Sequence, residues 1–290
     1  MTVDQLARMG LDPARFSARI EFLLGYAATA RDELESLSSA PVADNKDDLW
    51  LLRADYATAL REAGQLCMML DPPRAIELLR QASTVFIELG AGFGLFLNVL
   101  ADGESDTTAE LLDDALAIFP YQEPRDGYVD REVGHHFLTE PQQSAYILIS
   151  AVCNRRIARR HERLLLSILQ DSPQRSGVLP VGALGTPIHR YWAIARSIIE
   201  QKTPTTLVTH INAMCAAYDE AVQLAQTNTH LWENCSAPID LVDIDIVGIL
   251  ALTVRSFGHD LVTELFSNHR GLDRVSSTQI DIGFEMAQRL

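Results

Sequence analysis

Apolar residues recur every three or four positions along most of the chain, a spacing that predicts amphipathic helices. The first helix is expected to start at Asp12 and Pro13, because Asp can cap a helix and Pro fits its first turn. We expect it to end within residues 36–41. Its apolar positions are Phe16, Ile20, Leu23, Leu24, Ala27, Ala28 and Leu34.

Prolines and glycines mark the limits of the next helices. A second helix is predicted to begin near residues 44–48 and to end at the Asp-Pro-Pro segment 71–73, where a third begins. The glycine-rich segment 90–94 weakens or breaks the third helix ahead of an apolar run at 96–100. We interpret this segment as a packing or hinge element.

Two polar, irregular segments, 120–139 and 173–187, interrupt the helical pattern. Helices are expected between them, at about 140–170, and after them, near 188–201 and 205–226. Gly258 or Gly271 is expected to bound a last short helix.

Residues 239–248 carry two signals. Asp240, Asp243 and Asp245 alternate with apolar residues, which is partly typical of a strand. The apolar run continues through Leu252, and the neighbouring segments are helical, so a helix is favoured. Since no βαβ or β-hairpin pattern occurs elsewhere, the predicted fold class is all-α. Its architecture would be stacked antiparallel helical hairpins, as an irregular α-solenoid or a multi-helix bundle.

A chain of 290 residues with 47% hydrophobic residues can bury a large core without disulfides or metals. We expect residues 1–290 to form a single all-helical domain. It can be divided into two layers, with acidic helical hairpins at 1–119 and a second helical layer at 140–290.

Residues 59–88 resemble a degenerate tetratricopeptide repeat. Ala63 and Gly64 occupy a close-packing position in the first helix, and Ala75, Leu79 and Ala82 follow at that repeat's core spacing. The turn is about one residue short, and the proline expected after the second helix is absent. An ordinary helical hairpin with small residues at its interface is therefore the alternative.

Charge is distributed unevenly along the chain, whose formal net charge is −15. Residues 1–120 hold 20 acidic and 9 basic residues, residues 121–170 hold 6 and 7, and residues 171–290 hold 13 and 8. A strongly acidic region attracts cationic proteins and repels nucleic acid. Many proteins are acidic for solubility alone, which is the simpler reading. The candidate partner-binding residues are Glu33, Glu35, Asp44, Asp47, Asp48, Asp102, Glu104, Asp106, Asp113 and Asp114.

One arginine cluster stands against this acidic background, and most of it shares one helix face. The stripe can be solvated, can neutralise the acidic layer within the molecule, or can bind phosphate, nucleic acid or a protein. Its members are Arg155, Arg156, Arg159, Arg160 and Arg163.

No motif for catalysis or cofactor binding occurs: the chain lacks GxSxG, GxxxxGK[ST], GxGxxG after a strand, HExxH and CxxC. No catalytic, metal or cofactor residue is predicted. His135, His136 and His161 are the candidates for the alternative of an α-helical metal-dependent enzyme. Residues 102–108 alternate oxygen ligands as calcium loops do, but helix capping by Ser105 or Asp106 explains them better.

The chain is expected to be cytoplasmic. Its first residues lack the features of a signal peptide, and its longest apolar run, at 244–254, is too short to span a bilayer. Its four well-separated cysteines are consistent with a reducing compartment. Arginine supplies 22 of the 24 basic residues, which is typical of high-GC bacterial coding.

The architecture resembles the all-α immunity proteins of bacterial polymorphic toxin systems. The resemblance rests on the predicted helices 189–200, 207–226 and 238–258, the first of which carries Arg190, Tyr191, Trp192 and Ala193. It implies a protein that neutralises a toxin domain, and it transfers no interface residue. The alternative is a tetratricopeptide-like scaffold or regulator that binds a peptide in a concave groove.

Overall fold

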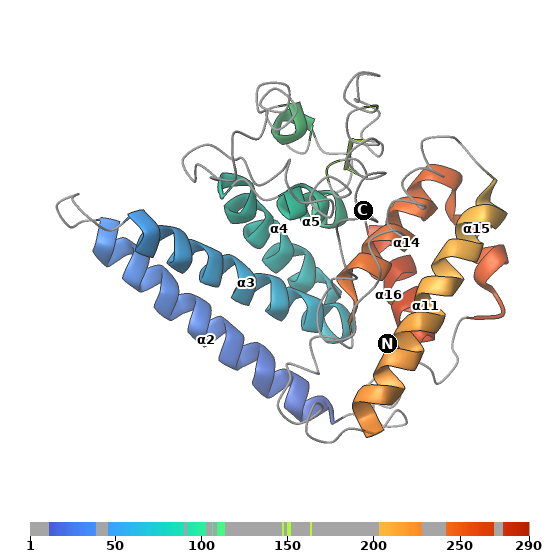
Figure 1. The fold of residues 1–290 in the computed structure, drawn as a ribbon, viewed down its shortest axis with the longest axis horizontal. Helices are drawn as coiled ribbons and strands as arrows, with labels where there is room; N and C mark the ends of the chain where they lie inside the picture. The colour runs from blue at the N-terminus through green and yellow to red at the C-terminus, as the bar shows by residue number, and fades with distance from the viewer. Residues whose placement is uncertain are drawn as a thin grey trace, which may run out of the picture.

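The computed structural model shows a helical protein (Figure 1). It describes residues 12–38, 46–89, 92–102, 106, 109–113, 147, 150–151, 163, 203–227, 242–269 and 275–289. All the regular secondary structure in these residues is helical, which confirms the all-α prediction.

Four helices form the N-terminal part, and each packs on the next along the chain (Figure 1). Their order is α2 (Pro13–Ser38), α3 (Lys46–Leu70), α4 (Pro72–Glu88) and α5 (Gly92–Asp102).

Local capping fixes two of these boundaries where the sequence predicts them. The Asp12 carboxylate accepts a hydrogen bond from the Ala14 amide at 2.9 Å, and α2 begins at Pro13. The Asp71 carboxylate accepts one from the Arg74 amide at 3.3 Å, and α4 begins at Pro72. Because such caps satisfy amides that the first turn leaves unpaired, both helix starts are encoded locally.

The α3–α4 interface depends on small residues. A Cβ atom at Gly64 would lie 2.9 Å from Cδ2 of Leu79, so a larger residue there would require the Leu79 side chain to move. Ala63 and Ala75 are also completely buried. Gly94 serves the same purpose between α4 and α5, where a Cβ would lie 2.8 Å from the Ile87 amide nitrogen. The predicted close packing is confirmed at both places.

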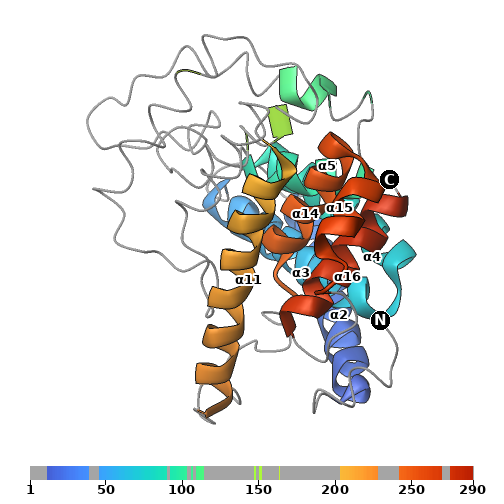
Figure 2. The ribbon, with the colours of Figure 1, turned by 90° about the vertical axis from the view of Figure 1, so that its right-hand side faces the viewer.

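The C-terminal part contains α11 (Pro204–Thr227), α14 (Ile244–Phe257), α15 (His259–Phe266) and α16 (Val275–Arg289), which gather beside α5 and α3 (Figure 2). The ambiguous segment is a helix from Ile244 onward. The Asp243 side chain caps it, accepting from the amides of Asp245 and Ile246 at 2.9 and 3.0 Å. The helix ends at Gly258, whose φ of +91° favours glycine.

In the described residues, two helices follow Gly258, and the last of them is longer than the short last helix that the sequence predicts. The longer one, α16, buries Ile280, Ile282, Phe284 and Met286. Their spacing of two does not show a helical period, because α16 is covered on more than one side by α14, α11 and α15.

The contacts between the N-terminal and C-terminal parts include the following three. The Phe96 ring on α5 fills the space over Gly248 on α14, where a Cβ atom would overlap it. Gln65 Nε2 donates to the Val242 carbonyl at 2.8 Å, and Arg255 Nη1 donates to the Val99 carbonyl at 2.8 Å. Buried residues from both parts form one hydrophobic cluster.

Several predictions fall partly or wholly outside the described residues. They concern the helices at 140–170 and 188–201, the two-layer division, and the arginine stripe apart from Arg163, which is exposed on a helix. Among the described residues, no helix is both long and apolar enough to cross a bilayer.

Candidate partner-binding surface

The structure brings three of the predicted acidic residues to one end of the α2–α3 hairpin. Glu33 and Glu35 lie near the end of α2, Asp48 lies near the start of α3, and all three are exposed. We call this end the hairpin tip and define it as residues 29–38 and 46–55. The tip contains six acidic residues and three basic ones. Asp47 belongs to α3, and Asp44 lies outside the described residues.

The second group of predicted acids lies at another edge of the molecule. Asp106 and Asp113 are exposed helical residues. The helical segment 109–113 is the green one above α5, away from the blue end of the α2–α3 hairpin (Figure 1). Asp102 ends α5, while Glu104 and Asp114 lie outside the described residues. The acids whose side chains the structure describes are therefore divided between two separate places.

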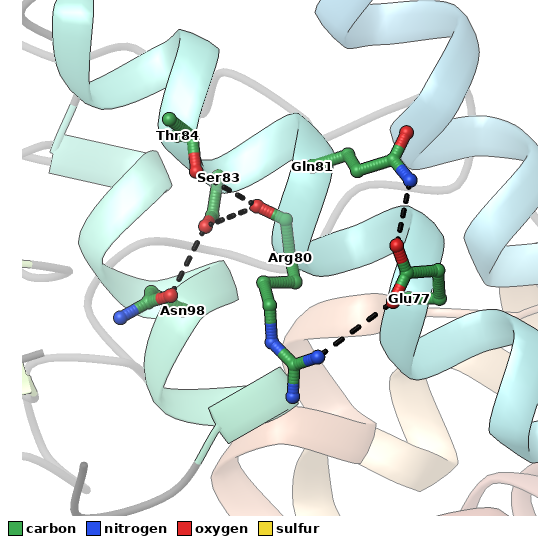
Figure 3. Close-up of polar contacts among 6 residues, drawn as sticks. All are labelled: Glu77, Arg80, Gln81, Ser83, Thr84 and Asn98. Carbon is green, nitrogen blue, oxygen red and sulfur yellow. Dashed lines mark hydrogen bonds and ion pairs between the residues drawn. The ribbon is translucent and has the colours of Figure 1, made fainter. Parts of the chain in front are cut away.

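Ionic pairing differs between the tip and the neighbouring helix. On α4, Glu77 accepts a hydrogen bond from Gln81 Nε2 at 2.8 Å and lies 3.7 Å from Arg80 Nη1 (Figure 3). At the tip, the one ion pair found within the described residues joins Arg31 to Asp32 at 3.7 Å. Within the same residues, no cation lies at ion-pair distance from Glu33, Glu35 or Asp48.

The polar residues on the other side of α4 have a structural role. The buried Ser83 hydroxyl lies 2.8 Å from the Arg80 carbonyl oxygen and 3.2 Å from Asn98 Oδ1 on α5 (Figure 3). Burying a hydroxyl without a partner costs free energy, so this contact offsets the desolvation of both side chains.

Large apolar side chains are exposed at the tip and on the part of α2 that precedes it. Phe22 and Tyr26 on α2 are 61% and 47% exposed, and Leu51 on α3 is 55% exposed. The Tyr26 hydroxyl donates a hydrogen bond to Asp55 Oδ2 at 3.1 Å, which ties the two helices together at the surface. The pKa of Tyr26 is raised by this hydrogen bond first, then by the Asp55 charge, by burial and by the charge of Glu33.

Sequence reasoning did not find these exposed apolar residues. Phe22 and Tyr26 are four residues apart, so they share a helix face, and both fall outside the periodic apolar set of α2. Their position outside the apolar period could have indicated them from the sequence. An aromatic residue that does not lie on the core-facing side of a helix must be exposed or must contact another element.

Groups that could carry chemistry are few among the described residues. Burial raises the pKa of the Cys67 thiol to about 11 and that of the Cys215 thiol to about 12, so both are poor nucleophiles near neutral pH. His259 Nδ1 lies 3.3 Å from Thr263 Oγ1, and its Nε2 lies 2.8 Å from Gln288 Nε2. The part of the chain that the structure describes contains no cluster of three potential metal ligands. His135, His136 and His161 lie outside it.

No known family model, curated protein or solved structure matches the chain. Functional inference therefore depends on the surface itself, and the hairpin tip is its most distinctive described feature.

Proposed function

We propose that the protein binds a basic protein partner and blocks it, as immunity proteins do to toxin domains. The observation that supports this proposal is the hairpin tip, where Glu33, Glu35 and Asp48 are exposed and have no cation at ion-pair distance among the residues that the structure describes. An exposed carboxylate keeps its full charge for an incoming partner, whereas one already paired, such as Glu77, offers less.

The net charge of −15 extends this effect beyond the tip. The electrostatic field of a negatively charged protein raises its association rate with positively charged proteins. A high association rate suits a protein that neutralises a toxin. The proposed role is non-enzymatic, needs no cofactor and places the protein in the cytoplasm.

A tetratricopeptide-like scaffold that binds a peptide is the second candidate. The close α3–α4 contact at Gly64 and Leu79 favours it, because small residues at this interface are part of that repeat's pattern. In that case the binding surface would be a concave groove formed by several hairpins, and substitutions at the tip would leave binding unchanged.

The test uses the toxin-like domain encoded beside this gene in its native host. Co-expression should restore growth to cells that produce the domain, and the purified proteins should associate. Glu35→Lys with Asp48→Lys should lower the association rate roughly tenfold or more at low salt, because the tip then repels the partner.

Glu77→Lys with Glu21→Lys is the matched control, because it changes the net charge equally at acids that already have arginine partners. It should have a clearly smaller effect on the association rate. Equal effects of the two pairs would refute the role of the tip. Absence of both growth rescue and association would refute the proposed function.

A further inference from the structure

The outward face of α2 carries an unusual order of side chains. Arg15 lies near one end, Phe22 and Tyr26 lie in the middle, and Glu33 lies near the other end. All four are exposed. Their separations of seven, four and seven residues correspond to whole helical turns, so they share one face. We call this face the α2 stripe.

We propose that the α2 stripe binds the α2 stripe of a second copy of the chain, with the two helices antiparallel, in a two-fold symmetric dimer. This inference does not depend on the proposed function. The pairing uses Arg15, Phe22, Tyr26 and Glu33, and it leaves Glu35 and Asp48 available to a different partner.

The order of the residues is self-complementary. A two-fold axis at position 24 places Phe22 opposite Tyr26 of the second copy. The same axis places Arg15 opposite Glu33 of the second copy. Two independent pairs, one aromatic and one ionic, therefore share a single centre. A stripe of 19 positions spans about 27 Å, so the ionic pairs would flank the aromatic ones at both ends.

Small residues beside the aromatic pair allow the helices to come close. Ala18, Gly25 and Thr29 are exposed on the same side of α2. A Cβ atom added to Gly25 would meet no atom within 4 Å, so space is open directly beside the proposed axis. When small residues lie between large ones on a helix surface, the large side chains of a second helix can pack into the gaps. Two helices packed in this way have axes roughly 8–10 Å apart.

Neighbouring residues extend the complementarity. The Arg19 guanidinium lies 5.0 Å from the Phe22 ring centroid. In the antiparallel pair, Arg19 lies opposite Thr29 of the second copy. Thr29 is about one turn from Tyr26, whose hydroxyl is hydrogen-bonded to Asp55 in the same copy. Leu51 lies one turn before Asp55 on α3 and adds apolar surface at the flank.

A basic helix from another protein fits this stripe less well. It would be attracted to Glu33 and Asp55, but the exposed Arg15 and the nearby Arg19 would repel it. A second, antiparallel copy satisfies the acidic end, the aromatic centre and the basic end together. Isologous contacts of this kind are the commonest route to homodimers.

Sedimentation equilibrium over a range of protein concentrations tests the proposal. The unaltered chain should form a dimer, and Phe22→Glu should raise the dimer dissociation constant at least about 100-fold by placing charges at the aromatic centre. Arg15→Glu and Glu33→Arg should each raise it roughly tenfold, because each reversal acts at both symmetric ends. The double variant Arg15→Glu with Glu33→Arg should restore the original constant.

A cross-linking measurement gives a second, independent readout. Gly25→Cys should form a covalent dimer quickly on oxidation, because the two introduced thiols lie on either side of the axis. Ala28→Cys is the matched control, since it is also exposed on α2 but lies away from the stripe. Circular dichroism of each variant checks that the fold is retained.

Four results would overturn the proposal. Three of them are a monomer at all concentrations, equal cross-linking of Gly25→Cys and Ala28→Cys, and a charge-swapped double variant that dimerises no better than its single parents. A dimer that survives Phe22→Glu would place the interface elsewhere and would overturn it as well.

Discussion

Helices α2 and α14 differ most clearly in what surrounds them. α2 is 26 residues long and buries one stripe: Phe16, Ile20, Leu23, Ala27 and Ala30. α14 is 14 residues long and is buried at every position from Ile244 to Val254. An edge helix needs one apolar face, whereas a central helix is covered on all sides. Position in the fold thus decides which sequence features are available for binding.

This contrast places stability and recognition in different regions. The central helix offers no exposed side chain between Ile244 and Val254, so substitutions there should act on folding alone. The edge helix holds large exposed residues such as Phe22 that do not serve the core, so substitutions there should act on association.

The largest difference is expected for leucine truncations. Leu250→Ala in α14 should lower the free energy of unfolding by about 2–5 kcal/mol, because Leu250 is fully buried against Gly283 of α16. Leu51→Ala at the tip should change it by less than about 0.5 kcal/mol. Urea denaturation measures both. Similar losses from the two variants would contradict the contrast between buried and exposed regions.

Alkaline pH should also destabilise the fold through buried thiols. An exposed thiol ionises near pH 9, whereas the pKa of Cys67 is raised to about 11 by burial. The unfolded chain therefore releases this proton first, and stability should fall as pH rises from about 9 to 11, by roughly 2 kcal/mol. Cys67→Ala should remove this part of the pH dependence. An unchanged slope between pH 9 and 11 would show that Cys67 is not responsible.

Two glycines should respond to alanine in opposite directions. Gly248→Ala should destabilise by about 1–3 kcal/mol, since the new methyl group overlaps the Phe96 ring. Gly25→Ala should stabilise the fold of each chain by up to about 1 kcal/mol, because the helix gains propensity and the methyl group meets no atom of the same chain within 4 Å. Thermal and urea unfolding of both variants measure the sign of each change in the free energy of unfolding. If Gly248→Ala stabilised the protein, α5 and α14 would be able to move apart without a cost in free energy.

The smallest effects are expected at the helix caps. Asp243→Ala should cost about 1–2 kcal/mol, because two amides at the buried start of α14 lose their acceptor. Asp12→Ala should cost about 0.5 kcal/mol, since water can replace it at the exposed start of α2. Asn at either position should recover most of the loss in urea denaturation. Equal costs at the two caps would contradict the role of burial.

The candidate surface was only partly predictable. The acids Glu33, Glu35 and Asp48 could be named from charge alone, but charge could not show which of the ten candidates meet in space. Phe22 and Tyr26 were not singled out, because exposure depends on which face of α2 the neighbouring helix covers. The α2–α3 contact decides that, and the Tyr26–Asp55 hydrogen bond spans 29 residues of sequence.

The helical class and the boundaries set by local chemistry follow from the sequence alone, as the Asp12 and Asp71 caps and the prolines after them illustrate. Those signals act within one turn, so they need no tertiary partner. Tertiary packing resolves what the sequence left ambiguous. Residues from Ile244 form a helix that is buried at every position to Val254, and Ile280, Ile282, Phe284 and Met286 of α16 are all buried although they are spaced by two. Burial on several sides erases the amphipathic period, and the neighbours that cause it come from distant parts of the chain.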